Sequence, residues 1–325
     1  MTTTRIYKST DSSAPVLTGQ ASSLIDLLDA CLVNGYGSQT AAGWTKPYTG
    51  TDKAAFRNSV SAGGTGMYLR VLDDGSGTGG AREALVRGYH TMSDVDTGTV
   101  ETPTAAQVST SLVWRKSNTT NSTARSWWLI ADERTFYLCV NSGTLTGEYG
   151  AGLFGAGDID SWVPGDVYGW FVVGRETQQG AGSQGTHQGL CTRAEANFGA
   201  PTNGFWLPSG YAGIGSPIRA AIAFPTTSTG GIGTSTNSIA RPAPGSGLDM
   251  WIAAWIGCES TIRGSLRGLY APLHDSSGIA IGTEFSAPPG LPSAVLVALG
   301  HGTNAVVTTT AAAGRMFVDR VGPWP

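Results

Sequence analysis

The chain has 325 residues and a formal net charge of -3, and only 13% of its residues are charged, where soluble proteins average about 25%. It contains 47 glycines, yet 40% of its residues are hydrophobic and 9% are aromatic, which excludes intrinsic disorder. The near-neutral charge gives no electrostatic footprint for phosphate backbones or anionic lipid, so we expect neither nucleic acid nor a membrane as a partner.

The first ten residues, MTTTRIYKST, are polar and lack the apolar core of a secretion signal. Later apolar runs, such as 250–258 and 294–299, are too short to span a bilayer. We therefore expect synthesis in the host cytoplasm. Because polar terminal segments stay disordered unless a partner orders them, we predict an N-terminal arm over residues 1–20, with Thr2 to Gly19 as the docking segment.

One amphipathic helix is predicted after this arm, in the segment ASSLIDLLDACLVNGYG. Ser22 or Ser23 can cap its start, and Asn34-Gly35 can end it. Its apolar residues follow the i, i+3, i+4, i+7, i+8 spacing of one helix face, namely Leu24, Leu27, Leu28, Cys31 and Leu32. We expect the helix to dock onto another part of the structure through this single apolar stripe.

Short apolar segments bounded by turn residues follow the helix and predict strands. The expected strands are 54–58, 66–72, 84–92, 111–116, 127–131, 135–140, 167–174, 218–224, 250–257, 266–269, 294–299 and 316–320. The clearest hairpin is RSWWLIADERTFYLCVN, with Asp132, Glu133 and Arg134 at its tip. The pattern predicts a mainly β fold, a β-sandwich or jelly-roll-like stack of antiparallel sheets with one N-terminal α-helix.

Composition divides the chain after the arm into three parts. Residues 21–175 are expected to form a β-rich domain with the N-terminal helix. Residues 176–247 are rich in Gly, Ser, Thr and Pro, which indicates long loops or an inserted lobe. Residues 248–325 are expected to add C-terminal strands that pack on the same β body.

A glycine-rich loop carries the G-x-G-x-x-G spacing of dinucleotide-binding sites at Gly75, Gly77 and Gly80. Asp73 and Asp74 would repel a pyrophosphate there, and the following residues EALVRGYH alternate as a strand does instead of forming a helix. The loop is therefore interpreted as a β-hairpin connection, and no cofactor is expected.

Metal and catalytic signals are sparse. Asp94, Asp96 and Glu101 surround Gly98 in a partial calcium-loop spacing, although ordinary turn capping explains the same residues. Four widely spaced cysteines without a C-x-x-C motif indicate buried free thiols, and the four histidines are isolated. Paired carboxylates for glycoside hydrolysis stay open, because their geometry depends on the fold; those available are Glu148, Asp158, Glu176 and Glu259.

Several tryptophans are candidates for binding by stacking. Trp127 and Trp128 are adjacent in a predicted strand, so they must face opposite sides, and one of them is expected to contact a second layer, a neighbouring subunit or a ligand. Phe205 and Trp206 lie in the Gly-rich segment and are the candidates for an exposed, glycan-stacking surface. Trp162, Trp170, Trp251 and Trp255 complete the set of candidates, although tryptophan in strands is more often buried between sheets.

Several segments resemble a family of tailed-bacteriophage virion proteins. They are RIYKSTDSSAPVLTG, LLDACLVNGYG, AAGWTKPYTGTDKAAFR, RGYHTMSDVDTG, WRKSN and WWLIADERTFYL, followed near the C-terminus by LRGLYAPLHD and FVDRVGPW. The resemblance covers residues 1–175 and the C-terminal end, and it implies a place in the virion but no set of catalytic residues. The Gly-rich segment after Gly174 departs from it and leaves a host-facing role open.

The expected function is therefore that of a structural or accessory virion component, in the tail or neck or as a capsid decoration. It would act through protein–protein contacts with other virion proteins and as a homo-oligomer, because a surface with few charges can be buried without desolvating ions. The chain is not expected to be an enzyme. A host-glycan-binding, receptor-binding module of the tail is the alternative, and a glycan hydrolase is the third hypothesis.

Overall fold

The computed structural model describes residues 2–143, 151–177, 190, 204–210, 216–223, 251–259, 261–272, 279–300 and 316–325. In this part of the chain the protein is mainly β, with antiparallel sheets, one α-helix and one sheet that curls into a half barrel. The predicted fold class, a β-sandwich-like stack of sheets with an N-terminal helix, is confirmed.

The helix α1 (Ser23–Leu28) continues into a π-helical segment, η1 (Asp29–Asn34). Its predicted apolar stripe is buried, and Gly35 ends it with a positive φ of 79°. Its start differs from the prediction, because neither serine makes a side-chain cap. A carboxylate oxygen of Asp73, which follows β4, instead accepts a hydrogen bond from the amide of Leu24 at 2.9 Å.

A five-stranded antiparallel sheet covers one side of the molecule, and a small hairpin of β6 (Thr91–Asp94) and β7 (Thr97–Thr99) extends from it. Its strands, in spatial order, are β2 (Thr45–Gly50), β3 (Lys53–Arg57), β4 (Tyr68–Leu72), β5 (Glu83–Tyr89) and β8 (Leu112–Arg115). The glycine-rich loop connects β4 to β5 and holds only a 3₁₀ turn, η2 (Gly80–Arg82). The hairpin interpretation of this loop is confirmed.

The second sheet is the one that curls. Its main path is β1 (Arg5–Lys8), β9 (Trp127–Ala131), β10 (Thr135–Asn141), β11 (Ala151–Ser161), β17 (Thr261–Pro272), β20 (Met316–Asp319), β19 (Val295–Leu299) and β18 (Glu284–Ser286). Side branches add β12 (Trp170–Gly174), β13 (Gly204–Leu207), β14 (Ile218–Arg219), β15 (Ala221–Ala223) and β16 (Trp251–Cys258). The sheet divides at β11, where residues 155–158 pair with β12 and residues 159–161 pair with β17.

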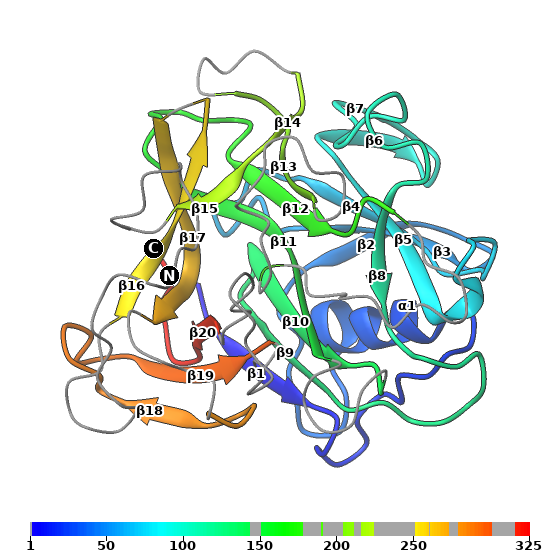
Figure 1. Ribbon diagram of the computed structural model, residues 1–325, viewed down its shortest axis with the longest axis horizontal. Coiled ribbons are helices and arrows are strands. Elements are labelled where there is room, and N and C mark those ends of the chain that lie inside the picture. The colour runs from blue at the N-terminus through cyan, green and yellow to red at the C-terminus, as the bar shows by residue number, and fades with distance from the viewer. Residues whose placement is uncertain are drawn as a thin grey trace, which may run out of the picture.

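The central strands β9 to β13 separate two hydrophobic cores. One core lies between these strands, the five-stranded sheet and α1. The other is enclosed by the curl and is completed by β16, β17, β19 and β20. Figure 1 shows these central strands in green, between the cyan strands at the right and the yellow-to-red strands at the left. Both faces of the central strands are therefore buried, which explains the nearly continuous apolar sequences of β9, β10 and β12.

The N-terminal segment is part of this body and differs from the expected arm. β1 pairs antiparallel with β9 along its length, and Leu17 forms a β-bridge with Arg125. Tyr7 is fully buried, and its hydroxyl donates to the carbonyl of Thr40 at 2.7 Å. Strand pairing within the chain therefore orders this segment without a partner.

β11 and β13 form in segments where no strand was predicted. Glycines interrupt the apolar pattern of β11, and β13 is a four-residue strand within the Gly-rich segment. Between residues 176 and 247 the structure describes residues 176–177, 190, 204–210 and 216–223, so the rest of the predicted lobe lies outside the described residues. The strands after residue 250 share the curled sheet through the β11–β17 pairing.

The chain has few charges, and several of them lie inside as ion pairs. Glu83 and Arg115 pair at 2.8 Å, and Asp73 and Lys116 pair at 2.6 Å, with all four side chains at most 1% exposed. The pair between Asp132 and Arg267 is also fully buried. Burial raises the pKa of Asp73 to about 6, because desolvation outweighs the attraction of the Lys116 ammonium.

Candidate functional site

A polar pocket of about 590 Å³ opens beside the C-terminal end of β11. We call it the β11 pocket; its walls include Thr65, His90, Arg134, Asp160, Ser161 and Val167. These residues come from the β3–β4 connection, the end of β5, the β9–β10 turn, β11 itself and the β11–β12 connection. Its volume falls within the roughly 300–1,000 Å³ that is typical of small-ligand sites.

The buried side chain of Asp158 connects the segments that form one wall of the pocket. Its fully buried carboxylate accepts hydrogen bonds from Asn58 Nδ2 at 2.7 Å and from the hydroxyl and amide of Thr65 at 2.6 and 3.1 Å. Arg134 Nε donates to the same carboxylate at 2.9 Å. One side chain thus fixes the β3–β4 connection and the β9–β10 turn against β11, which limits their motion at the pocket.

Asp166 fixes the opposite wall, the segment 161–169 that connects β11 to β12. It accepts two bonds from Arg263 Nη2, at 2.7 and 2.8 Å, one from the Ser161 hydroxyl at 2.7 Å and one from the Tyr168 amide at 3.0 Å. Arg263, on β17, is fully buried and also donates to the backbone carbonyls of residues 209–210. The segment is therefore held by a satisfied ion-pair network.

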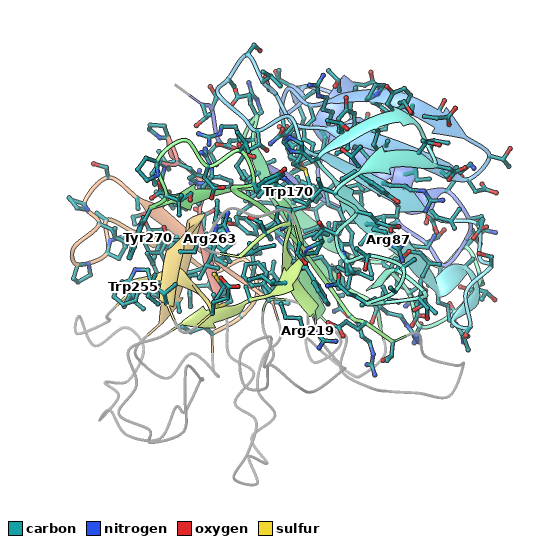
Figure 2. The ribbon with its side chains drawn as sticks, turned by 90° about the horizontal axis from the view of Figure 1, so that it is seen from above. Arg87, Trp170, Arg219, Trp255, Arg263 and Tyr270 are labelled. Carbon is teal, nitrogen blue, oxygen red and sulfur yellow. The ribbon has the colours of Figure 1, made fainter. Side chains whose placement is uncertain are left out.

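This rigid segment presents large apolar side chains to solvent. Trp162 is 53% exposed and Val167 is 58% exposed, although both flank the buried anchor. The Trp162 ring packs edge-on against Trp255 of β16, with the ring centroids 6.4 Å apart. Figure 2 shows Arg263 within the body and Trp255 nearer its outer boundary. Exposed tryptophan on a fixed loop is typical of a recognition surface.

His90 contributes a neutral imidazole to the pocket wall. Its ring lies against Tyr168, with the centroids 5.1 Å apart, and its Nδ1 atom is buried without a hydrogen-bond partner. Burial lowers the pKa of His90 below its usual 6.5, because desolvation disfavours the imidazolium. At neutral pH the ring can therefore donate from one nitrogen and accept at the other.

The charges around the pocket do not cancel completely. Arg134 is paired with Asp158, and Asp166 is paired with Arg263. Asp160 lines the pocket, and no ion pair to it is found among the described residues. The site therefore carries an excess of negative charge. The Nη atoms of Arg134, which is 23% exposed, have no partner in the described part of the chain and are available as donors.

Among the described residues that line the pocket, no nucleophile is hydrogen-bonded to a base. The Ser161 hydroxyl donates to Asp166 and accepts from the Val163 amide, so it is not hydrogen-bonded to His90. The arrangement offers separate donors and acceptors on rigid walls, which is suited to holding a polar ligand.

Phe205 and Trp206 do not form an exposed stacking surface, so this prediction is wrong. They are only 1% and 3% exposed, because β13 lies between the two cores and directs one ring into each. Trp206 Nε1 donates to Glu176 at 2.9 Å, and the Arg219 guanidinium lies 5.1 Å from the Trp206 ring centre and pairs with Glu176. These residues hold β13 and β14 together.

Trp127 and Trp128 face opposite sides of β9, as predicted. Trp127 is fully buried in the core beneath the five-stranded sheet, and its Nε1 donates to the carbonyl of Pro15 at 3.1 Å. Trp128 is partly buried and packs against the core inside the curl. Of the three contacts that were expected for one of these tryptophans, the structure shows a second layer of the same chain.

The calcium hypothesis for Asp94, Asp96 and Glu101 is not supported by their geometry. Asp96 pairs with Lys53 and, at 2.6 Å, with Arg70. Glu101 pairs with Arg87, and Asp94 accepts a bond from the Val95 amide at 2.5 Å. Ion pairing therefore takes up two of the carboxylates, and in the described ranges no group of three or more His, Cys, Asp or Glu residues could hold a metal ion.

Among the described residues, the carboxylates that were candidates for glycoside hydrolysis do not form a catalytic pair. Asp158 and Glu176 are engaged in ion pairs, and Glu259 lies in the turn between β16 and β17. Glu148, Cys191, His187, His274 and His301 lie outside the described residues. The prediction of buried free thiols is confirmed for Cys31, Cys139 and Cys258.

Sequence reasoning missed most of the β11 pocket. Thr65 and Arg134 belong to no recognisable sequence motif. They contact Asp158 only because strands that are distant in sequence pair with one another. A usable signal is present in the segment SWVPGDVYG, where a tryptophan and two valines stand among turn-forming residues. Large apolar side chains in such a turn indicate either an anchor or a contact surface.

Comparison with known proteins adds no family assignment. No protein-family model matches the chain, and no curated protein matches it. Among the helices of the described residues, none is long and apolar enough to cross a membrane. The resemblance to virion proteins therefore stays a prediction.

Proposed function

We propose that the protein is a structural or accessory component of a tailed-bacteriophage particle, in the tail, in the neck or on the capsid surface. It acts through contacts with other virion proteins and with copies of itself. The proposal combines the sequence resemblance with the way the molecule distributes its apolar and charged groups.

The supporting observation is an aromatic cluster on the outer face of the curled sheet. Phe317 of β20 is buried at its centre, and Trp251 and Phe285 pack around it with ring centroids 4.3 and 5.8 Å away. Tyr270 lies beside Phe317 in the β17–β20 register and is only partly buried. We call Trp251, Tyr270, Phe285 and Phe317 the outer aromatic face.

This face stands apart from the core inside the curl. Along β17, Leu269 points into the curl and Tyr270 points away from it, and β20 alternates in the same way at Val318 and Phe317. The cluster is a small third core that also contains Leu296 and Ala298, and Tyr270 and Phe285 are only partly buried at its edge. Aromatic groups of this kind are enriched at protein interfaces. The location of Tyr270 on β17 can be followed in Figure 2.

The burial of several ion pairs inside the protein also favours extensive protein–protein contacts. Ion pairs such as Glu83 with Arg115 and Asp132 with Arg267 lie inside the body. A chain with few ionic groups that places several of them internally has less surface charge to desolvate when it assembles. This property suits a subunit that is surrounded by neighbours in a particle.

The experiment is quantitative mass spectrometry of purified particles, with immunogold labelling to locate the protein. We expect a fixed copy number per particle and one labelled position. Tyr270→Ala should lower particle occupancy severalfold, while Tyr48→Ala, the same change at a partly buried tyrosine of the five-stranded sheet, should not. Absence of the protein from purified particles would refute the proposal, and normal occupancy of the Tyr270 variant would exclude the outer aromatic face.

A further inference from the structure

We propose that the β11 pocket is a binding site for a neutral saccharide. This inference goes beyond a structural role in the particle, because it gives the subunit a ligand of its own. It rests on the shape of the pocket, on its fixed walls and on the chemistry of its lining, and it moves glycan recognition away from the buried Phe205 and Trp206.

The charge of the lining selects the class of ligand. An anion such as a phosphate or a sialic acid would meet the carboxylate of Asp160, while the guanidinium of Arg134 is already paired with Asp158. A divalent cation is disfavoured because hard cations require six to eight oxygen ligands, and the described carboxylates here do not converge on one point. An uncharged ligand rich in hydroxyl groups avoids both penalties.

The hydrogen-bonding groups match such a ligand. The Asp160 carboxylate can accept from hydroxyls, and the Nη atoms of Arg134 can donate to them. His90 adds a buried Nδ1 atom without a partner. Each sugar hydroxyl both donates and accepts, so separate acceptors and donors on facing walls can hold neighbouring hydroxyls. Val163 and Val167 supply apolar contact for the C–H face of the ring.

Both walls are organised before a ligand arrives. Asp158 fixes the wall that carries Thr65 and Arg134, and Asp166 fixes the wall that carries Ser161 and Val167. A site whose side chains are already held in place loses less conformational entropy on binding, which favours measurable affinity for a small polar molecule.

Trp162 belongs to the same connection as the pocket lining but is not itself a lining residue. It stands in the chain between the lining residues Ser161 and Val163, and its ring is half exposed beside Trp255. Such a ring offers a stacking surface to a further sugar unit. The ligand is therefore expected to be an oligosaccharide rather than a single sugar.

The first test is a glycan array of neutral and acidic oligosaccharides, followed by titration calorimetry of the full-length protein with the neutral oligosaccharide that binds best. Asp160→Asn removes the unpaired charge without changing side-chain size and should weaken binding at least tenfold. Asp94→Asn removes the same charge from an exposed site on β6 and should change affinity less than twofold. Thermal unfolding of both variants establishes that they are folded.

A second pair of variants tests shape without altering charge. Val167→Phe narrows the pocket at an exposed position and should abolish binding, while Val321→Phe adds the same bulk at another exposed valine and should not. Binding restricted to acidic glycans, absence of binding on the array, or equal affinity of the Asp160 and Asp94 variants would each overturn the proposal. Particle occupancy of Asp160→Asn should stay normal, which separates this result from a failure of the structural role.

Discussion

Arg263 and Asp166, 97 residues apart in sequence, form an ion pair in which neither side chain is more than 4% exposed. The pair joins β17 to the segment that carries Trp162 and Val167. The position of this wall of the β11 pocket, and of the exposed Trp162 and Val167 on it, therefore depends on one buried ion pair.

Removal of one member of this pair should destabilise the protein strongly. Arg263→Met leaves Asp166 buried without its counter-ion, so we expect the free energy of unfolding in urea to fall by about 3–5 kcal/mol. The control is Arg320→Met, because the Arg320–Glu284 pair is about one-third exposed and such pairs contribute about 0–1 kcal/mol. Equal losses in the two variants would contradict the structural role given to Arg263.

Asp73 should make stability depend on pH. Burial raises its pKa from 3.8 to about 6 in the folded state, so the folded protein binds a proton more tightly than the unfolded chain between these values. The stabilisation is complete below about pH 4 and is lost as the pH rises through about 6, a change of roughly 3 kcal/mol at 1.36 kcal/mol per pKa unit.

The measurement is the free energy of unfolding of the wild type and of Asp73→Asn across this pH range. Asparagine cannot titrate, so the stability of the wild type relative to the variant should decrease from pH 4 to pH 6.5. Parallel curves would show that the pKa of Asp73 is not raised.

Gly88 should not tolerate a larger side chain. A Cβ atom at this position of β5 would lie 2.4 Å from the ring of Trp170, which is fully buried. Gly88→Ala should therefore lower the free energy of unfolding by about 1–3 kcal/mol through overpacking. Gly50→Ala is the control, because its Cβ would meet only the flexible side chain of Lys53. A thermal denaturation series compares them, and similar midpoints would indicate that the Trp170 ring moves aside.

The pKa of His90 should depend on Tyr168. The tyrosine ring covers the imidazole, and burial lowers the pKa of His90 below 6.5. Tyr168→Ala exposes the ring to water, so the pKa should rise towards 6.5, as measured by the pH dependence of the imidazole NMR signals. Tyr270→Ala, the same change at a partly buried tyrosine of β17, should leave this titration unchanged. If the pKa of His90 does not change in the Tyr168 variant, other residues must be responsible for the desolvation that lowers it.

The sequence patterns correctly predicted the elements whose structure depends mainly on nearby residues. The apolar stripe from Leu24 to Leu32 identified the helix, and the residue types around Asp132 identified the β9–β10 hairpin. β11 was not predicted, because glycines interrupt its apolar pattern and its formation depends on three neighbouring strands. Strand formation there is decided by tertiary pairing rather than by local propensity.

Site residues were harder to predict for the same reason. Asn58 and Asp158 are 100 residues apart and meet across two sheets, so no spacing in the sequence connects them. Phe205 and Trp206 seemed exposed because glycine and serine surround them, but strand pairing buries both. Composition describes a segment, whereas exposure depends on what the rest of the chain packs against it.

Because strands β9 to β13 are buried on both faces, the N-terminal part of the chain cannot fold stably without the strands that follow residue 250. Tyr137 and Phe171 belong to the core inside the curl, and residues after 250 supply the opposite wall of that core. A fragment that ends at residue 175 would keep most of its first core but would expose these aromatic rings to water. Such a fragment would aggregate or bind a surrogate strand, so the body is stable only once the strands after residue 250 have been added.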